Sequence, residues 1–176
     1  MISRTPGEGR YAQLEREQRW LLAELPSDVR DERMIVDHYW SGTSLRLRVI
    51  QDGDEVVYKL CQKVRVSRDD PALVKITNIY LSSEEFHVLS VTPSSIVAKS
   101  RWTATWNGVD YAVDEFKGRH AGLVLAELEI REGEPRSSGP EFALAEVTHV
   151  NEYSGGWLAT ASDYDLSRVI AREGAA

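Results

Sequence analysis

The sequence predicts a mainly β domain, built as an antiparallel sandwich or a closed barrel with a few peripheral helices. Short runs rich in Val, Ile, Tyr, Trp and Thr, in which apolar and polar residues alternate, fill most of the chain. Turn residues separate these runs, and Asn107-Gly108 is the strongest hairpin signal among them. Helical signals are few by comparison. These three observations favour an antiparallel sheet that curves around one interior.

The alternating runs predict eight strands and a short ninth. They are expected over residues 13–22, 34–40, 45–51, 55–65, 74–81, 96–106, 109–117, 123–131 and, for the ninth, 146–147. Turn clusters at residues 41–42, 52–54 and 107–108 fall between successive runs. Each cluster is short enough to join neighbouring antiparallel strands, which supports the assignment.

Three helices are also expected. The first covers residues 82–89, where Ser82 is a suitable N-cap and Glu84 and Glu85 lie in the first turn. The second covers residues 140–144. The third covers residues 162–172, with Ser162 or Asp163 as its cap.

The length of 176 residues is that of one domain. We expect a single domain over residues 1–176, with a core of about residues 13–160 followed by the C-terminal helix. The one cysteine, Cys61, cannot form a disulfide within the chain, which is typical of a reducing compartment. No signal peptide and no apolar run of about 20 residues is present. The expected location is therefore the cytoplasm.

The net charge of −7 argues against nucleic acid or an anionic membrane as the main partner. Both reward clustered positive surface, because both carry dense negative charge. We expect a small-molecule partner, and a monomer or homodimer.

Charged side chains occupy one face of several predicted strands, because residues two apart point to the same side of a sheet. Five strands carry same-face pairs of like charge: Glu15 and Glu17, Arg46 and Arg48, Lys59 and Lys63, Lys99 and Arg101, and Glu127 and Glu129. A solvated face would explain any one pair, but it would not separate acidic strands from basic ones. The pattern favours charged faces that meet inside a closed barrel.

The interior of such a barrel would carry a net charge of +2. Its basic set is Arg19, Arg46, Arg48, Lys59, Lys63, Lys99 and Arg101, and its acidic set is Glu15, Glu17, Asp114, Glu127 and Glu129. Charges of this density are unstable in a dry core, so the interior must hold water and a ligand. Clustered carboxylates suit a hard cation such as Mg²⁺ or Mn²⁺, and arginine and lysine suit phosphate oxygens. A short polyphosphate bound with a divalent cation satisfies both sets.

Several segments resemble the CYTH superfamily, the triphosphate tunnel metalloenzymes, which include class IV adenylate cyclases, thiamine triphosphatases and inorganic triphosphatases. Residues 15–19 read Glu-Arg-Glu-Gln-Arg and are similar to the Glu-x-Glu-x-Lys signature of that family. The likeness continues through residues 37–40, 45–48, 58–63, 113–116, 122–129 and 146–153. It therefore covers about residues 13 to 160, in the family's order and with its spacing.

The resemblance implies an eight-stranded antiparallel tunnel that binds a triphosphate with Mg²⁺ or Mn²⁺. The acidic set would bind the metal, the basic set would bind phosphate, and Glu17, Glu129 and Arg19 are the candidate catalytic residues. The activity it implies is metal-dependent hydrolysis of tripolyphosphate, a nucleoside triphosphate or thiamine triphosphate. Arg19 departs from the signature, which has lysine there, and arginine cannot release a proton.

Two other functions stay open at this stage. A class IV type adenylate cyclase would use a similar pocket to make cyclic AMP from ATP. A non-catalytic receptor for polyphosphate or an organic phosphate would bind without turnover, and Arg19 in place of lysine favours it. A lipocalin-like carrier is disfavoured, because its interior would be apolar.

Overall fold

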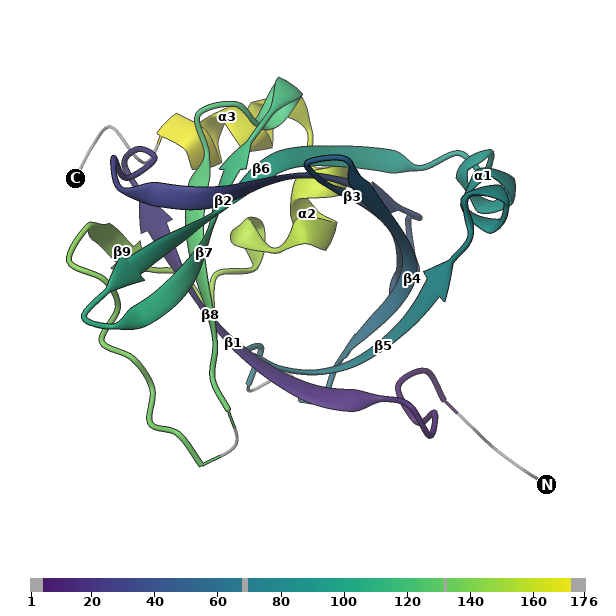
Figure 1. Ribbon diagram of the computed structural model, residues 1–176, viewed down its shortest axis with the longest axis horizontal. Helices are drawn as coiled ribbons and strands as arrows, with labels where there is room; N and C mark the ends of the chain where they lie inside the picture. Colours follow the sequence, from purple (N-terminus) through teal and green to yellow (C-terminus); the bar gives the residue numbers. More distant parts are fainter. Residues whose placement is uncertain (1–4, 68–69, 132, 172–176) are drawn as a thin grey trace.

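An antiparallel sheet that closes on itself forms the body of this computed structural model, which describes residues 5–67, 70–131 and 133–171 (Figure 1). Within those ranges the strands are β1 (Gln13–Leu22), β2 (Val29–Tyr39), β3 (Leu45–Asp52), β4 (Glu55–Arg65), β5 (Leu73–Leu81), β6 (Ser95–Trp106), β7 (Val109–Phe116), β8 (Val124–Glu129) and β9 (Ala143–Glu146). Their order in the sheet is β5-β4-β3-β2-β6-β7-β8-β1-β9, and β1 also pairs with β5. Strands β1 to β8 thus make the closed antiparallel barrel that the sequence predicts as one of two architectures.

Seven of the eight longer predicted strands agree with the structure to within two residues at each end. Strand β2 is the exception, because it begins at Val29 rather than Met34. Its register with β6 shifts between Arg30 and Arg33, and Asp31 there has a φ of 57°. This charged bulge lacks the apolar alternation from which the other strands were predicted.

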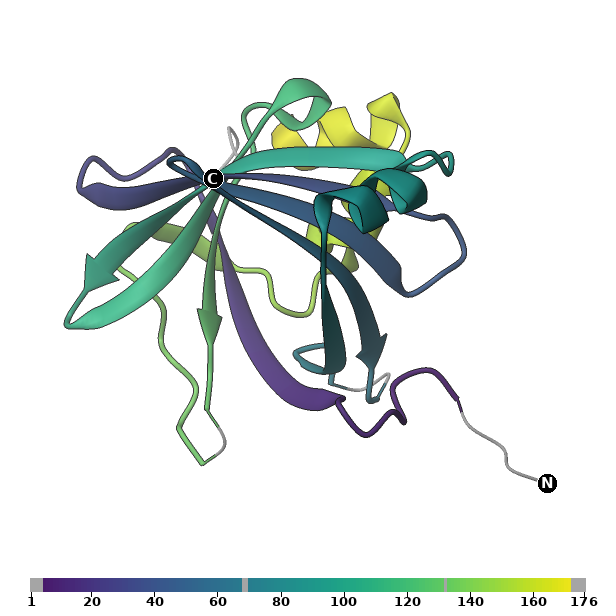
Figure 2. The same cartoon turned by 45° about the vertical axis from the view of Figure 1, so that its right-hand side comes forward.

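In Figure 2 the neighbouring β6–β7 hairpin projects on the side of the molecule opposite α1 (Ser83–Ser90).

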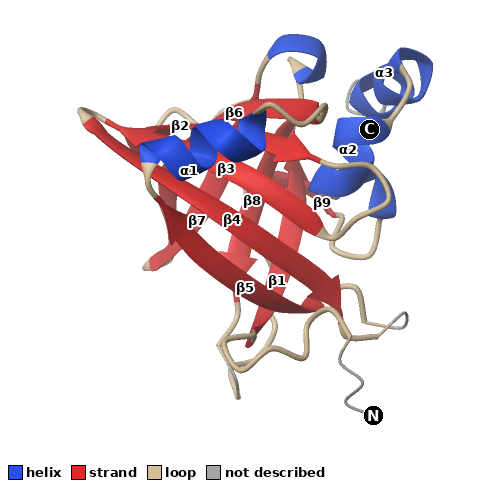
Figure 3. Cartoon of the chain, turned by 90° about the vertical axis from the view of Figure 1, so that its right-hand side faces the viewer, coloured by secondary structure: helices blue, strands red, loops and turns tan. Residues whose placement is uncertain are grey.

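The first and third predicted helices are confirmed. Helix α1 has a capping box, in which the Ser82 side chain accepts from the Glu85 backbone N–H and the Glu85 side chain accepts from the Ser82 backbone N–H. It lies against the outside of the barrel (Figure 3). Helix α3 covers Asp163–Ala171, and the predicted end at Arg172 lies outside the described residues. Within the described ranges, no helix has the length and apolar character needed to cross a membrane.

Two assignments near the C-terminal end were wrong. The predicted helix at residues 140–144 is a turn that leads into β9, where Ala143 to Glu146 pair with β1 instead. The short ninth strand, predicted at residues 146–147, therefore begins three residues earlier and shares only Glu146 with the prediction. Helix α2 (Gly155–Thr160) was not predicted, since two glycines begin it and disfavour a helix. Burial of Leu158 and Ala159 in the core compensates for the low helix propensity of these glycines.

Two apolar clusters pack on opposite faces of β1, β6, β7 and β8. One joins Val97, Phe116 and Leu125, on the inward face of the barrel, with Leu158 of α2 and Leu166 of α3 in a single buried cluster. The other lies on the outer face of β1, β6, β7 and β8 and is built on Trp20, Leu22, Tyr111, Val113 and Val124. Phe142, just before β9, and Ala143 of β9 pack against this second cluster, so part of the outer face of the barrel is buried as well.

Gly139 should be sensitive to substitution, because a methyl group there would lie 2.4 Å from Nε1 of the buried Trp20. Its φ of 88° is also unfavourable for any other residue. We expect Gly139→Ala to lower the free energy of unfolding by about 2–4 kcal/mol, the sum of overpacking and backbone strain. Gly108→Ala is the matched control in urea unfolding, since Gly108 has a φ of 77° but open space around it. Equal losses in both variants would exclude a role for the Trp20 contact.

Candidate functional site

A cavity of about 500 Å³ occupies the interior of the barrel. Its described charged lining is Arg19, Arg46, Arg48, Lys59, Lys63, Arg65, Lys99 and Arg101, with Glu15, Glu17, Asp37 and Glu127. Eight basic and four acidic side chains give this lining a formal charge of +4, in a chain whose total is −7. A charged lining at this density attracts small anions and excludes apolar ligands.

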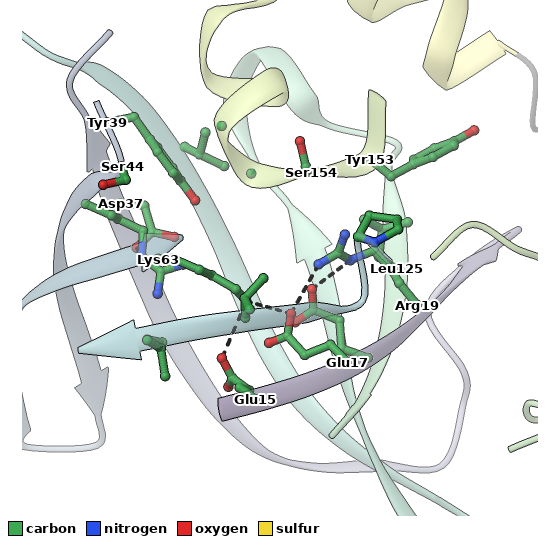
Figure 4. A pocket seen from close by; sticks show the side chains of 18 of the residues that line it. Glu15, Glu17, Arg19, Asp37, Tyr39, Ser44, Lys63, Leu125, Tyr153 and Ser154 are labelled. Carbon is green, nitrogen blue, oxygen red and sulfur yellow. Dashed lines mark hydrogen bonds and ion pairs between the residues drawn. The ribbon is translucent and has the colours of Figure 1, made fainter. Parts of the chain in front are cut away.

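The acidic side of the cavity is built on β1, where Glu15, Glu17 and Arg19 share one face of the strand (Figure 4). Lys63 of β4 donates to Glu17, with 2.7 Å between Nζ and Oε2, and its Nζ lies 3.6 Å from Oε2 of Glu15. Burial alone would raise the pKa of Glu17, but Lys63 and Arg19 outweigh it and lower that pKa. Glu17 is therefore ionised at neutral pH.

Arg19 and Arg101 share the carboxylate of Glu127. The Nε of Arg19 lies 2.9 Å from Oε1 of Glu127, and its Nη2 lies 3.5 Å from Oε2 of Glu17. Nη2 of Arg101 is 2.6 Å from Oε2 of Glu127. Because the guanidinium fork has several donors, Arg19 reaches two carboxylates at once.

Asp114 lies beneath the cavity lining and is fully buried. Arg101 donates to both of its oxygens, at 2.6 Å each, and Lys99 donates to Oδ2 as well. Burial, together with Arg101, lowers the pKa of Lys99, although Asp114 acts in the opposite direction. Together with the contacts of β1, these pairs form one chain of alternating charge from Glu15 to Lys99.

A second network joins β2 to β3 on another side of the cavity. Arg48 donates to the two oxygens of the buried Asp37, at 2.6 and 2.7 Å, and Nε of Arg46 lies 3.6 Å from Oδ1. Burial would raise the pKa of Asp37, but Arg46 and Arg48 outweigh it and hold the pKa far below its usual range. Asp37 is thus an anionic anchor that fixes two arginines.

Two cations of the lining have bonding capacity left. Nε of Arg46 is buried and has no hydrogen-bond partner among the described residues, apart from the 3.6 Å approach to Asp37. Lys59 makes no ion pair with any described residue, and burial with the nearby charges of Arg48 and Arg46 lowers its pKa. Both side chains line the cavity, so an anion that enters it would find donors there.

The structure brings together ten of the twelve side chains predicted for the interior. Asp114 is held under the lining by Lys99 and Arg101, and Glu129 is exposed and lies outside the cavity, although it pairs in register with Glu17. Sequence reasoning did not include Asp37 or Arg65 in the site. The two-residue alternation of a strand would have found Arg65, which follows Lys63 on the same face of β4.

The other boundary of the cavity is apolar and glycine-rich. Val97, Phe116 and Leu125 line it together with Ser154 and Gly155 at the start of α2. Figure 4 shows α2 lying across the cavity next to Tyr39. A side chain at Gly155 would place its Cβ 2.1 Å from Oη of Tyr39, so glycine allows this close approach.

Among the described residues, no three His, Cys, Asp or Glu side chains are grouped as a metal site. Glu15 and Glu17 are the closest fit for Mg²⁺ or Mn²⁺, because such ions often take one or two protein carboxylates and complete their shell with phosphate and water. Oε2 of Glu15 is buried and has no hydrogen bond to a described residue. Burial and the charge of Glu17 raise the pKa of Glu15, which is the effect of too little positive charge nearby. These two donors fit a divalent cation.

Acid should destabilise the fold through the buried carboxylates. The pKa values of Asp37 and Glu127 lie well below their usual values of 3.8 and 4.5, in each case because arginine neighbours outweigh burial. A lowered pKa in the folded state stabilises the protein above the unfolded value, and that stability is lost as the pH falls. We therefore expect the melting temperature to fall steadily below about pH 4.5. A melting temperature that stays constant from about pH 5 to about pH 2.5 would contradict this.

Solved structures of other proteins share the fold of this chain. No family model and no curated protein matches the sequence. Two crystal structures of the protein NE1496, described once as hypothetical and once as an inorganic triphosphatase, match with a TM-score of 0.55 at 24% and 23% identity. They cover 84% of this chain and 98% and 95% of their own. The protein PH1819 from Pyrococcus horikoshii OT3 matches with a TM-score of 0.50 at 13% identity, over 91% of this chain and 90% of its own. These likenesses show the fold.

Proposed function

We propose that the protein is a divalent-metal-dependent hydrolase of a triphosphate, bound inside the barrel. The observation that carries the proposal is a cavity with a formal lining charge of +4 in a chain of net charge −7. A linear triphosphate has several negative charges in a small volume, and it matches such a lining in sign and size. The inorganic triphosphatase NE1496, which has the same fold, adds support.

Basic side chains of the lining would bind the phosphate chain. Lys59 and Arg46 have donors to spare, so they are proposed to take phosphate oxygens first. Arg19 and Arg101, fixed by Glu127, would stabilise the charge that develops on the transferred phosphoryl group. Arg48, Lys63 and Lys99 complete the proposed phosphate-binding set.

Glu15 and Glu17 would hold Mg²⁺ or Mn²⁺. Such an ion, when bound, neutralises phosphate oxygens and lowers the pKa of a coordinated water. The acidic partners Asp114 and Glu127 are bonded to arginine and lysine, so we propose that they orient these cations. Arg19 does not act as a proton donor or acceptor in this scheme, because guanidinium remains charged.

The test is a panel of substrates. Purified protein is incubated with tripolyphosphate, ATP or thiamine triphosphate, each with Mg²⁺, with Mn²⁺ and with chelator. We expect phosphate to be released from at least one of them, and only with a metal. A control without protein measures the background in each mixture.

Two other outcomes would overturn the proposal. Cyclic AMP from ATP, with no phosphate released from any substrate, would indicate a cyclase. Metal-dependent binding of tripolyphosphate with no product would indicate a receptor. Product analysis together with a binding measurement separates all three functions.

A further inference from the structure

Lys63 occupies a distinctive place in the cavity. It belongs to β4, which pairs with β5 and not with β1, yet its side chain reaches the carboxylates of β1. Nζ lies 2.7 Å from Oε2 of Glu17 and 3.6 Å from Oε2 of Glu15. Figure 4 shows the three side chains converging. One ammonium group therefore lies between the two carboxylates that best fit a divalent cation.

Lys59 provides an internal comparison. It lies on the same strand and lines the same cavity, four residues before Lys63, but it makes no ion pair with a described residue. The local difference is reflected in the pKa values. Burial lowers both, but Glu17 and Glu15 raise the pKa of Lys63 overall, whereas Arg48 and Arg46 lower that of Lys59 further. Lys63 is thus tied to carboxylates, and Lys59 is surrounded by cations.

An ammonium group and a divalent cation compete for the same carboxylate oxygens. A bare cation entering this site would have to displace Lys63 into a cavity whose lining is already net positive. The other two carboxylates of the lining, Asp37 and Glu127, are already paired with arginines, so the displaced ammonium would lose more than it gains and the exchange is unfavourable. A cation that arrives with phosphate oxygens brings a new partner for Lys63, and the exchange then becomes favourable.

We infer that Lys63 makes metal binding conditional on the triphosphate. When the metal–triphosphate complex enters, the ammonium moves from Glu15 and Glu17 to phosphate oxygens, and the metal takes the carboxylates. The species recognised is thus the complex, and bare metal binds weakly. Lys63 acts as a positioning and specificity residue here, and the inference rests on the proposed function.

The experiment compares Lys63→Gln with Lys59→Gln, which removes the same charge from the same strand. Isothermal titration with bare Mn²⁺, without any phosphate, is expected to show binding at least about tenfold tighter to Lys63→Gln than to the wild type. Lys59→Gln should bind bare Mn²⁺ with close to wild-type affinity. Titration with a preformed Mn²⁺–tripolyphosphate complex should show weaker binding to both variants, because each loses a phosphate-binding cation.

A third variant is expected to weaken the binding of bare Mn²⁺ instead of strengthening it. Lys63→Arg keeps the charge and adds a fork that can hold both carboxylates, so it should bind bare Mn²⁺ several-fold more weakly than the wild type. This variant also serves if Lys63→Gln fails to fold, which thermal melting would reveal.

The inference would be overturned if Lys63→Gln and the wild type bound bare Mn²⁺ with equal affinity. It would also be overturned if Lys59→Gln gained as much affinity for bare Mn²⁺ as Lys63→Gln. Either result would count even if the wild type hydrolyses triphosphates. Absence of turnover by the wild type on every substrate would overturn the proposed function instead. The bare-metal titrations use no phosphate, so the two failures are distinguishable.

Discussion

Replacing Asp114 by alanine is expected to lower the free energy of unfolding by about 3–5 kcal/mol. The carboxylate is fully buried and neutralises both Lys99 and Arg101, which are themselves inside the barrel. Without this carboxylate, the buried cations of Lys99 and Arg101 remain close together. Unpaired buried charges destabilise the fold far more than the intact ion pairs stabilise it. Chemical denaturation at neutral pH measures the loss. The melting temperature should fall by roughly 6–20 °C.

Asp110→Ala provides the matched control for this result. Asp110 lies on the same strand and pairs with Arg30, but both side chains are about half exposed. Exposed ion pairs contribute little, so this variant should unfold within about 1 kcal/mol of the wild type. A similarly small effect of Asp114→Ala would mean that Lys99 and Arg101 find other partners or water, and that Asp114 is not a structural anchor.

Replacing Glu17 by glutamine is expected to lower kcat/KM for the triphosphate substrate by about 100-fold or more. Glutamine keeps the shape of the side chain but removes the charge that would hold the metal and that now pairs with Lys63 and Arg19. Steady-state kinetics at several Mg²⁺ and Mn²⁺ concentrations measure the effect. Part of the loss should be recovered at high metal concentration, since weaker metal binding is its main cause.

Glu115→Gln is the control for the kinetics, because Glu115 lies on β7 outside the cavity and pairs with Lys117. It should keep activity within about threefold of the wild type, as surface changes usually do. Full activity in Glu17→Gln, with the fold intact, would exclude Glu17 from metal binding. Glu129→Gln belongs in the same series, because its catalytic role stays a prediction.

The alternation rule accounts for most of what the sequence predicted correctly. Because same-face residues of a strand point into the same space, Glu15 with Glu17 and Arg46 with Arg48 could be assigned to one interior from their spacing along the chain. Closure of the barrel follows from the same pattern, since a closed sheet gives the charged faces of separate strands a common space. The strand limits followed from turn signals such as Asn107-Gly108, where Asn107 has a φ of 49°.

What the sequence did not predict depends on tertiary contacts. The nearest residues on the same face of β2 as Asp37 are Ile35 and Tyr39, which are uncharged, so no same-face pair of charges identified Asp37. Helix α2 has two glycines and forms because Leu158 and Ala159 pack in the core. The pairing of Lys63 with Glu17 joins residues 46 positions apart, and no local pattern specifies which interior cation meets which carboxylate.

Strand β1 bonds to β5 along its first half and to β8 along its second, so one short segment closes the whole ring. Its partners on β8 lie more than a hundred residues further along the chain. Most of the polypeptide must therefore be synthesised before β1 can pair with β8. Until then the backbone N–H and C=O groups on one edge of β1 have no strand partner. The charged interior can consequently assemble only late in the synthesis and folding of the chain.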